Sequence, residues 1–265
     1  MNVINQANRT LRLAADRLRR KQAHKGQGID YEGAWDNYAE MWRYREPNLA
    51  HIGDEWTGEG AGAAKSLKEY EDLIETEYIT PYIEAADDVM EIGVGGGRTA
   101  VLLKRHCHSL ACIDISEEML KAAHERLGDD GVSYVKVDGM HLSGIRSHST
   151  DVCFCFDTMV HLEPRDIFNY LTQIPDLMHG KRLCVFHHTN TLSDLGWQRF
   201  LYEWDDNLMG RAGGSFSIMT NELMERFLTY LGYEILRQDA ESVPRDCVWI
   251  ARAPEKVSVP LKVTF

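Results

Sequence analysis

The 265-residue sequence lacks several features that would assign it to common protein classes. No stretch of about 18 uncharged apolar residues occurs, so the sequence predicts no membrane-spanning helix. Residues 1–21 lack the apolar core of a secretory signal, and we therefore expect a cytoplasmic protein. No C-x-x-C pair occurs among the six cysteines, so neither a zinc site nor a disulfide framework is predicted, and we expect no bound metal.

Positive charge is also scarce, and it is unevenly distributed. The chain has 41 Asp and Glu against 29 Lys and Arg, a net charge of −12, yet residues 1–27 are basic. The remainder is therefore more acidic than the total suggests. Because such a body repels phosphate backbones, we expect nucleic acid not to be the substrate.

From residue 66 onward, helical and strand patterns alternate along the chain. Apolar runs typical of strands cover 87–92, 109–114, 132–137, 150–156, 181–187, 233–239 and 246–252. Helical patterns cover 66–79, 98–106, 116–127, 164–178 and 220–231. This alternation predicts an α/β, doubly wound, mostly parallel sheet covered by helices on both faces. The short "AESVPR" linker predicts a final hairpin, which makes one strand antiparallel.

Three regions flank or interrupt this pattern. Residues 1–65 are predicted to form an N-terminal helical extension whose aromatic part, 31–64, either packs on the core or closes over a flat ligand as a lid. The main domain is expected over 66–253, with residues 254–265 as a tail. An insert at 189–218 is far longer than an ordinary connection of about two to six residues. We expect this insert to form a cap over the site where the substrate binds.

The stretch "VMEIGVGGGRT", residues 89–99, follows the first strand of this pattern. A triphosphate-binding loop would need Lys-Ser/Thr after the last glycine, and Arg98 and Thr99 stand there instead. A dinucleotide fingerprint spaces its glycines G-x-G-x-x-G, and Arg98 breaks that spacing. The spacing that fits is an acid at Glu91 followed by alternate glycines at 93, 95 and 97.

Carboxylates follow the next three strands of the pattern. Asp114 lies in "ACIDIS", Asp138 lies in "VKVDGM", and Asp157 lies in "FCFDTMVHLE". With Glu91 they form an acidic rim, which would repel a pyrophosphate and attract a ligand that bears a sulfonium and an ammonium group. Arg98, at the start of a helix, could meet that ligand's own carboxylate. These features together point to S-adenosylmethionine.

In this order and spacing, "EIGVGGG", Asp114, Asp138-Gly139 and "DTMVHLE" resemble a class I S-adenosylmethionine-dependent methyltransferase over residues 66–252. The resemblance implies a seven-stranded sheet, with Asp114 on the ribose, Asp138 on the adenine amine, and Gly93 and Gly95 near the methionine part. The expected cofactor-binding residues are Glu91, Gly93, Gly95, Gly97, Arg98, Asp114, Ile115, Asp138, Gly139, Met140 and Asp157. "HIGDEWTG", at 51–58, is similar to methyltransferases that modify sugars and polysaccharides.

Histidines at strand ends are the expected catalytic residues. A hydroxyl acceptor benefits from a positioned base, and histidine suits neutral pH. His161, shortly after the fourth strand, is the first candidate. Of the pair His187 and His188, alternation points only one toward the ligand, and we favour His188 because it is nearer the loop. Asp157 could orient the hydroxyl.

Aromatic and polar residues around the insert suggest a small-molecule acceptor, such as a sugar or an aromatic natural product, because tryptophan and tyrosine stack on such rings. The expected substrate-binding residues are Trp42, Trp56, His187, Asn190, Trp197, Trp204 and Arg211. Oxygen is favoured over nitrogen as the methylated atom. The alternatives are an N-methyltransferase, an RNA or protein methyltransferase, an NAD-dependent oxidoreductase and a non-catalytic binding module. A homodimer is a further expectation.

Overall fold

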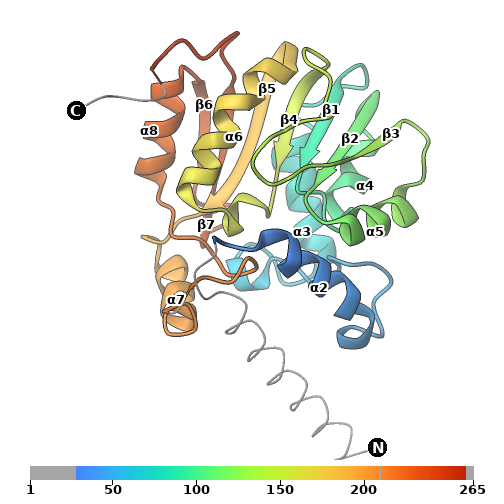
Figure 1. The fold of residues 1–265 in the computed structure, drawn as a ribbon, viewed down its shortest axis with the longest axis vertical. Coiled ribbons are helices and arrows are strands. Elements are labelled where there is room, and N and C mark those ends of the chain that lie inside the picture. Colours follow the sequence, from blue (N-terminus) through green and yellow to red (C-terminus); the bar gives the residue numbers. More distant parts are fainter. Residues whose placement is uncertain (1–27, 209, 261–265) are drawn as a thin grey trace, which may run out of the picture.

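Seven strands form a single sheet in the computed structural model, which describes residues 28–208 and 210–260. Their order is β3-β2-β1-β4-β5-β7-β6 (Figure 1). The strands are β1 Asp88–Ile92, β2 Ser109–Asp114, β3 Val132–Lys136, β4 Thr150–Cys155, β5 Met178–Thr189, β6 Glu234–Asp239 and β7 Asp246–Arg252. β7 runs antiparallel to both β5 and β6, whereas β1 to β5 pair in parallel. The predicted sheet and its terminal hairpin are confirmed.

The helices follow the predicted alternation closely. They are α2 Tyr31–Arg45, α3 Leu67–Ile74, α4 Arg98–Lys104, α5 Glu117–Leu127, α6 Pro164–Leu177, α7 Asp194–Glu203 and α8 Asn221–Leu231. Side-chain caps explain several starts: the hydroxyl of Ser116 accepts the Met119 N–H, and that of Thr220 accepts the Leu223 N–H. Over the described ranges, none of these helices combines the length and apolarity that crossing a bilayer requires.

The central strands are buried on both faces, so successive side chains enter two separate core layers. On β4, Cys153 and Cys155 belong to the layer covered by α6 and α8, and Phe154 belongs to the layer covered by α3, α4 and α5. Cys153 and Cys155 therefore share one face of the sheet. All six cysteines are free thiols. A sheet buried on both sides leaves its strand ends as the place for a ligand.

Helix α2 lies across the carboxyl end of the sheet, at the same end of the molecule as α7 (Figure 1). Its Asp36 accepts a hydrogen bond from the Ser116 hydroxyl at 2.6 Å, before α5. Tyr31, at its first residue, donates to Asp166 of α6 at 2.8 Å, and Glu32 pairs with Lys136 of β3 at 2.7 Å. The helical extension is thus bound to three elements of the sheet domain. The helix predicted within residues 1–27 lies outside the described residues.

Candidate active site

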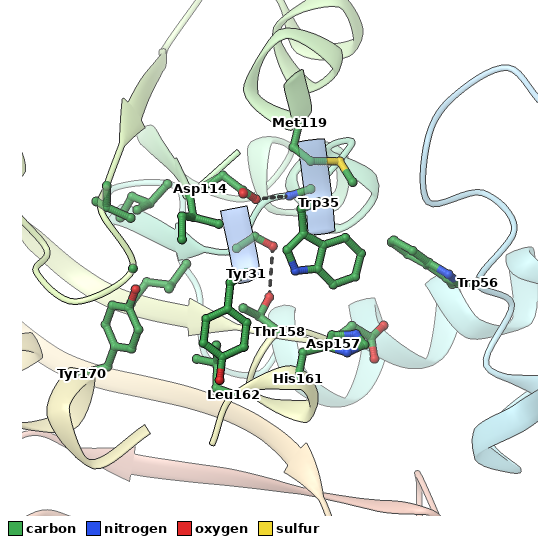
Figure 2. A pocket seen from close by; sticks show the side chains of 17 residues that line it. Tyr31, Trp35, Trp56, Asp114, Met119, Asp157, Thr158, His161, Leu162 and Tyr170 are labelled. Carbon is green, nitrogen blue, oxygen red and sulfur yellow. Dashed lines mark hydrogen bonds between the residues drawn. The ribbon is translucent and has the colours of Figure 1, made fainter. Parts of the chain in front are cut away.

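A cavity of about 90 Å³ lies where β1, β2 and β4 end. Figure 2 shows it between the glycine turn, the end of β2, the segment after β4 and the side chains that α2 extends inward. The lining residues labelled there are Tyr31, Trp35, Trp56, Asp114, Met119, Asp157, Thr158, His161, Leu162 and Tyr170. The cavity therefore occupies the edge of the sheet where the sequence predicts the cofactor.

Glycine is needed at positions 93 and 95 of the turn for two different structural reasons. Gly93 has φ +76°, and a Cβ there would lie 2.2 Å from the Thr158 hydroxyl oxygen, which itself donates to the Gly93 carbonyl at 3.0 Å. Gly95 has φ +53° and lines the cavity, yet a Cβ on it would meet nothing within 4 Å. A side chain at 93 is excluded by protein, whereas one at 95 would enter space kept open beside the backbone.

Asp114 presents a buried carboxylate to the same cavity. Its two oxygens accept the backbone N–H groups of Gly95 and Ser116, each at 2.9 Å. Burial raises the pKa of Asp114 to about 6, although these two N–H groups act in the opposite direction. Each oxygen retains a lone pair for another donor, as a ribose diol would need. Asp114 thus lines the cavity, and its binding of a ribose stays a prediction.

Glu91 lies at the foot of the turn and is almost fully buried. Burial raises the pKa of its carboxyl group well above the usual range. Among the described residues, its Oε2 has no hydrogen-bond partner. A buried polar atom without a partner is costly, so Oε2 fits a polar or cationic ligand group. With the open side of Gly95 and the carboxylate of Asp114, the site has the features of a cradle for a nucleoside that carries an ammonium group.

The expected adenine contact differs from the structure. Asp138 is exposed, and its carboxylate accepts the backbone N–H groups of Met140 and His141 and contacts the His141 ring at 2.8 Å. Neither Asp138 nor Met140 lines the cavity, whereas Gly139 and Ile115 do. Local side-chain to backbone bonding holds Asp138 in its turn. The chain brings the backbone of 139 to the cavity in its place.

Arg98 also differs from the expectation of a ligand-binding guanidinium. It is buried, pairs with Asp157, and donates to the Trp56 carbonyl at 2.7 Å. Its guanidinium carbon lies 4.9 Å from the ring centre of Tyr70. These partners turn Arg98 away from the cavity, and Gly97 serves as the residue before α4 with φ +82°. Arg98 therefore holds the side chain of Asp157 and the backbone at Trp56 in place.

Asp157 begins a buried chain of alternating charges. Arg98 pairs with Asp157, and His187 lies 3.2 Å from Asp157 on one ring nitrogen and 3.2 Å from Asp246 on the other. Asp246 then pairs with Arg245 at 2.6 Å. Burial disfavours the ionised carboxylate, but Arg98 and His187 outweigh it and hold the pKa of Asp157 well below its usual range. Asp157 is therefore ionised at neutral pH, with its backbone at φ +56°.

His187 is the centre of this chain and is fully buried. Burial lowers its pKa, but the hydrogen bonds to Asp157 and Asp246 outweigh burial and raise the pKa to about 9. The backbone N–H of Asp157 also points at Nδ1 from 3.0 Å, which favours a neutral ring. The attraction of the two carboxylates for a charged ring outweighs the effect of the one backbone N–H, so His187 is protonated at neutral pH. It does not line the cavity, whereas its partner Asp157 does.

His161 lies in the short helix Met159–His161 and lines the cavity. Its ring contacts Trp35 and Phe216 edge-on, with centroids 4.9 and 5.0 Å away. Burial lowers the pKa of His161 to about 4, and the nearby Arg211 acts in the same direction. Nδ1 lies 3.4 Å from the Ser215 carbonyl oxygen, which can only accept, so Nδ1 carries the proton of the neutral ring. Nε2 then presents a lone pair.

The expectation that His188 faces the ligand is wrong. His188 is fully buried and accepts a hydrogen bond from the indole N–H of Trp249 at 2.8 Å. Its Nδ1 lies 2.6 Å from the Thr189 carbonyl oxygen. Alternation on β5 turns His187 toward Asp157 and His188 into the opposite core layer. Asn190 likewise lines no cavity, since its side chain accepts the Leu192 N–H.

A second cavity, of about 510 Å³, adjoins the first. The two share Trp35, Trp56, Asp157 and His161. Trp56 stacks on Tyr38 with ring centroids 5.6 Å apart, which gives this cavity an aromatic wall. Trp56 lines both cavities, and its expected contact with the acceptor stays a prediction. The second cavity is the room available for an acceptor next to the first.

Four other predicted acceptor residues lie elsewhere or act indirectly. Trp42 is buried against α5 and donates to Glu55 at 3.0 Å. Trp197 stacks on Phe200 with half its surface exposed and lines none of the cavities described here. Trp204 lines a third cavity, of about 280 Å³, under the insert. Arg211 binds the backbone carbonyls of His161 and Ser215, so it fixes His161 in place.

Several lining residues escaped prediction as site residues. Trp35 and Tyr38 stood in the predicted aromatic extension, where only their helical spacing singled them out. Thr158 was inside the quoted "DTMVHLE" stretch, next to Asp157. Arg199 and Arg245 line the second cavity from α7 and from the loop before β7. They carried no signal, because only the fold brings these two arginines together.

Comparison with known families supports this geometry. Residues 90–174, which include the glycine turn, Asp114, Asp157 and His161, match the family model described as a methyltransferase domain. These residues belong to a methyltransferase domain, and the sheet has the class I methyltransferase fold. No curated protein matches its sequence. The all-parallel order 3-2-1-4-5-6 of dinucleotide-binding sheets differs from the order seen here, where the antiparallel β7 lies between β5 and β6. The oxidoreductase alternative is therefore set aside.

Solved structures share the fold of this methyltransferase domain. Magnesium protoporphyrin IX methyltransferase (ChlM) from Synechocystis PCC 6803, with bound SAH, is 14% identical with a TM-score of 0.58, over 82% of this chain and 96% of that chain. The DhpI–SAH complex is 15% identical with a TM-score of 0.58, over 84% and 95%. The CcbJ methyltransferase from Streptomyces caelestis is 15% identical with a TM-score of 0.57, over 85% and 99%.

Proposed function

We propose that this chain binds S-adenosylmethionine in the first cavity and methylates a hydroxyl group of a small aromatic molecule in the second, with His161 accepting the proton. The observation that carries the proposal is the position of His161, whose ring lines both cavities. A group that removes a proton during methyl transfer has to reach the acceptor where it meets the donor. His161 lies at that junction.

The donor would be held by residues at the strand ends. Asp114 would accept the ribose hydroxyls, Glu91 would provide its unpartnered oxygen to a polar group, and the backbone at Gly93, Gly95 and Gly139 would lie against the ligand. When bound, the donor supplies an electrophilic methyl group on a sulfonium. Two of the solved neighbours described above, ChlM and DhpI, contain SAH, which agrees with this assignment.

The protonation state of His161 suits a general base of limited strength. With a pKa of about 4, the ring is neutral at pH 7, and its Nε2 lone pair is available. A weak base transfers protons best from an acidic donor, so a phenol fits this site better than a sugar alcohol. The aromatic wall of Trp56 and Tyr38 also fits a planar ring. We therefore favour an aromatic acceptor over a sugar.

The test has two separate measurements. Calorimetric titration with S-adenosylhomocysteine should give binding to the wild-type chain. Methyl transfer from labelled S-adenosylmethionine to a panel of phenols and sugars should then identify the acceptor class. In His161→Asn, we expect kcat to fall by about 10²–10⁴-fold with donor affinity retained. The matched control is His124→Asn, because His124 lies on α5 and pairs with Asp129 at the surface.

The outcomes separate the parts of the proposal. Absence of S-adenosylhomocysteine binding would overturn the donor assignment. Donor binding with a His161→Asn rate within a few-fold of wild type would remove the base role, and it would favour an amine acceptor that is already neutral. Transfer to sugars and not to phenols would contradict the aromatic acceptor. A homodimer and the exclusion of nucleic acid as the substrate stay predictions.

A further inference from the structure

Two arginines from distant parts of the chain contact one phenyl ring beside the second cavity. The guanidinium carbon of Arg199, on α7, lies 4.2 Å from the ring centre of Phe216, and that of Arg245 lies 4.4 Å from it. Both arginines and Phe216 line the second and third cavities. The junction of these cavities therefore carries two positive charges on an aromatic support.

The carboxylates near these arginines leave part of each guanidinium unused. Arg245 directs Nε and Nη2 to Asp246, and its Nη1 makes no hydrogen bond to any residue of 28–208 or 210–260. Arg199 directs Nη2 to Glu203, whose other oxygen accepts the Phe216 N–H at 2.9 Å. The Nε of Arg199 is buried and has no partner within those ranges. A buried donor without a partner is costly, so this atom is suited to an acceptor from a ligand.

The acidic groups that line the second cavity are either exposed or already bonded to other residues. Glu55 accepts hydrogen bonds from Tyr38 and Trp42, and Asp157 is held by Arg98. Glu59 is exposed. Arg45 adds a third positive group to the lining. Glu203 and Asp246 already accept hydrogen bonds, so an external anion is the group that would bind the remaining N–H groups of Arg199 and Arg245.

We propose that the methyl acceptor carries an anionic group, a carboxylate or a phosphate, which binds between Arg199 and Arg245. This inference rests on the proposed function. The anion would lie at the junction of the second and third cavities, the aromatic body would extend along Trp56, and the hydroxyl would reach His161. Arginine binds oxyanions through its charged N–H groups, and the Nε of Arg199 and the Nη1 of Arg245 are the donors that the anion would take here.

The test uses three small phenols that differ in the group opposite the hydroxyl: a planar carboxylate, a tetrahedral phosphate and a neutral planar amide. The chain, saturated with S-adenosylhomocysteine, is titrated calorimetrically with 4-hydroxybenzoate, 4-hydroxyphenyl phosphate and neutral 4-hydroxybenzamide. In the wild type, we expect at least one anionic probe to bind about tenfold or more tightly than the amide. Which anion binds more tightly distinguishes a carboxylate from a phosphate. In Arg199→Gln, the preference should fall to within about twofold, because the charge and the buried donor are both lost.

Two further variants keep the test decisive. Arg245→Lys retains the charge that Asp246 requires, so it avoids leaving that carboxylate buried alone, and it should reduce the anion preference. Arg252→Gln is the matched control, since Arg252 pairs with Glu234 at the surface, and its preference should equal that of the wild type. Equal affinities for all three probes, or no binding of either anion, would overturn this inference. If S-adenosylhomocysteine itself fails to bind, the proposed function fails instead.

Discussion

Replacing His187 by glutamine tests the charge chain behind the active site. His187 lies between the carboxylates of Asp157 and Asp246, and the folded chain raises its pKa from 6.5 to about 9. Glutamine keeps a polar side chain but cannot carry the positive charge. We therefore expect His187→Gln to lower the free energy of unfolding near pH 6, and the loss should depend on pH.

The pKa shift fixes both the sign and the size of this dependence. A raised pKa stabilises the folded state in full below pH 6.5, and the stabilisation disappears as pH rises to about 9. The shift of about 2.5 pH units, at 1.36 kcal/mol each, corresponds to about 3 kcal/mol. The difference in unfolding free energy between wild type and His187→Gln should accordingly shrink by about 3 kcal/mol between pH 6 and pH 9.5.

Urea denaturation at half-unit pH intervals measures this difference directly. Exposed His108, which pairs with Asp88 at 3.0 Å, provides the matched control, and His108→Gln should change stability by less than about 0.5 kcal/mol at every pH. The reasoning is refuted if the His187→Gln loss is the same at pH 6 and pH 9.5. In that case His187 would be neutral in the folded chain, and its contacts would be those of an ordinary buried hydrogen bond.

Three further predictions concern the cavity and the core. Asp114→Asn should weaken S-adenosylhomocysteine binding by about 10–100-fold in calorimetry. Because Asp114 has a pKa of about 6, the affinity of the wild type should also fall as pH drops below 6. An affinity that does not change with pH would contradict the ribose role. Gly95→Ala should reduce donor affinity by about tenfold or more, because the added methyl group enters the cavity. Gly93→Ala should instead lower the free energy of unfolding by about 1–3 kcal/mol, because its methyl group clashes with Thr158. Equal effects of the two variants on donor binding would refute this distinction. Trp249→Phe removes the donor to buried His188 and should cost about 1–3 kcal/mol in urea unfolding with kcat unchanged, and a large loss of kcat would restore a catalytic role to His188.

The sequence was sufficient for the sheet because its signals are local. Apolar runs and helical patterns predicted each strand and the helices α3, α4, α5, α6 and α8, whereas α7 within the insert was not predicted. The same reasoning placed the glycine turn, Asp114 and His161 at one edge, because the carboxyl ends of parallel strands meet there.

Errors arose where side-chain direction or a distant partner decides the role. β5 is buried on both faces, so its apolar pattern could not tell whether His187 or His188 faces the site. Arg98 and Asp157 are 59 residues apart in the chain, and only the folded structure pairs them. Asp138 stands after a strand like Asp114 does, but the turn that follows uses its carboxylate for backbone N–H groups. Spacing alone does not distinguish these environments.

The three attachments of α2 have a kinetic consequence. Asp36, Tyr31 and Glu32 tie this helix to α5, α6 and β3 while its Trp35 ring stands over the first cavity (Figure 2). If release of the spent donor requires α2 to move, these bonds have to open and then reform in every cycle. Under rapid mixing, the first round of product would then emerge as a burst, followed by a slower steady rate set by the unlatching of one helix.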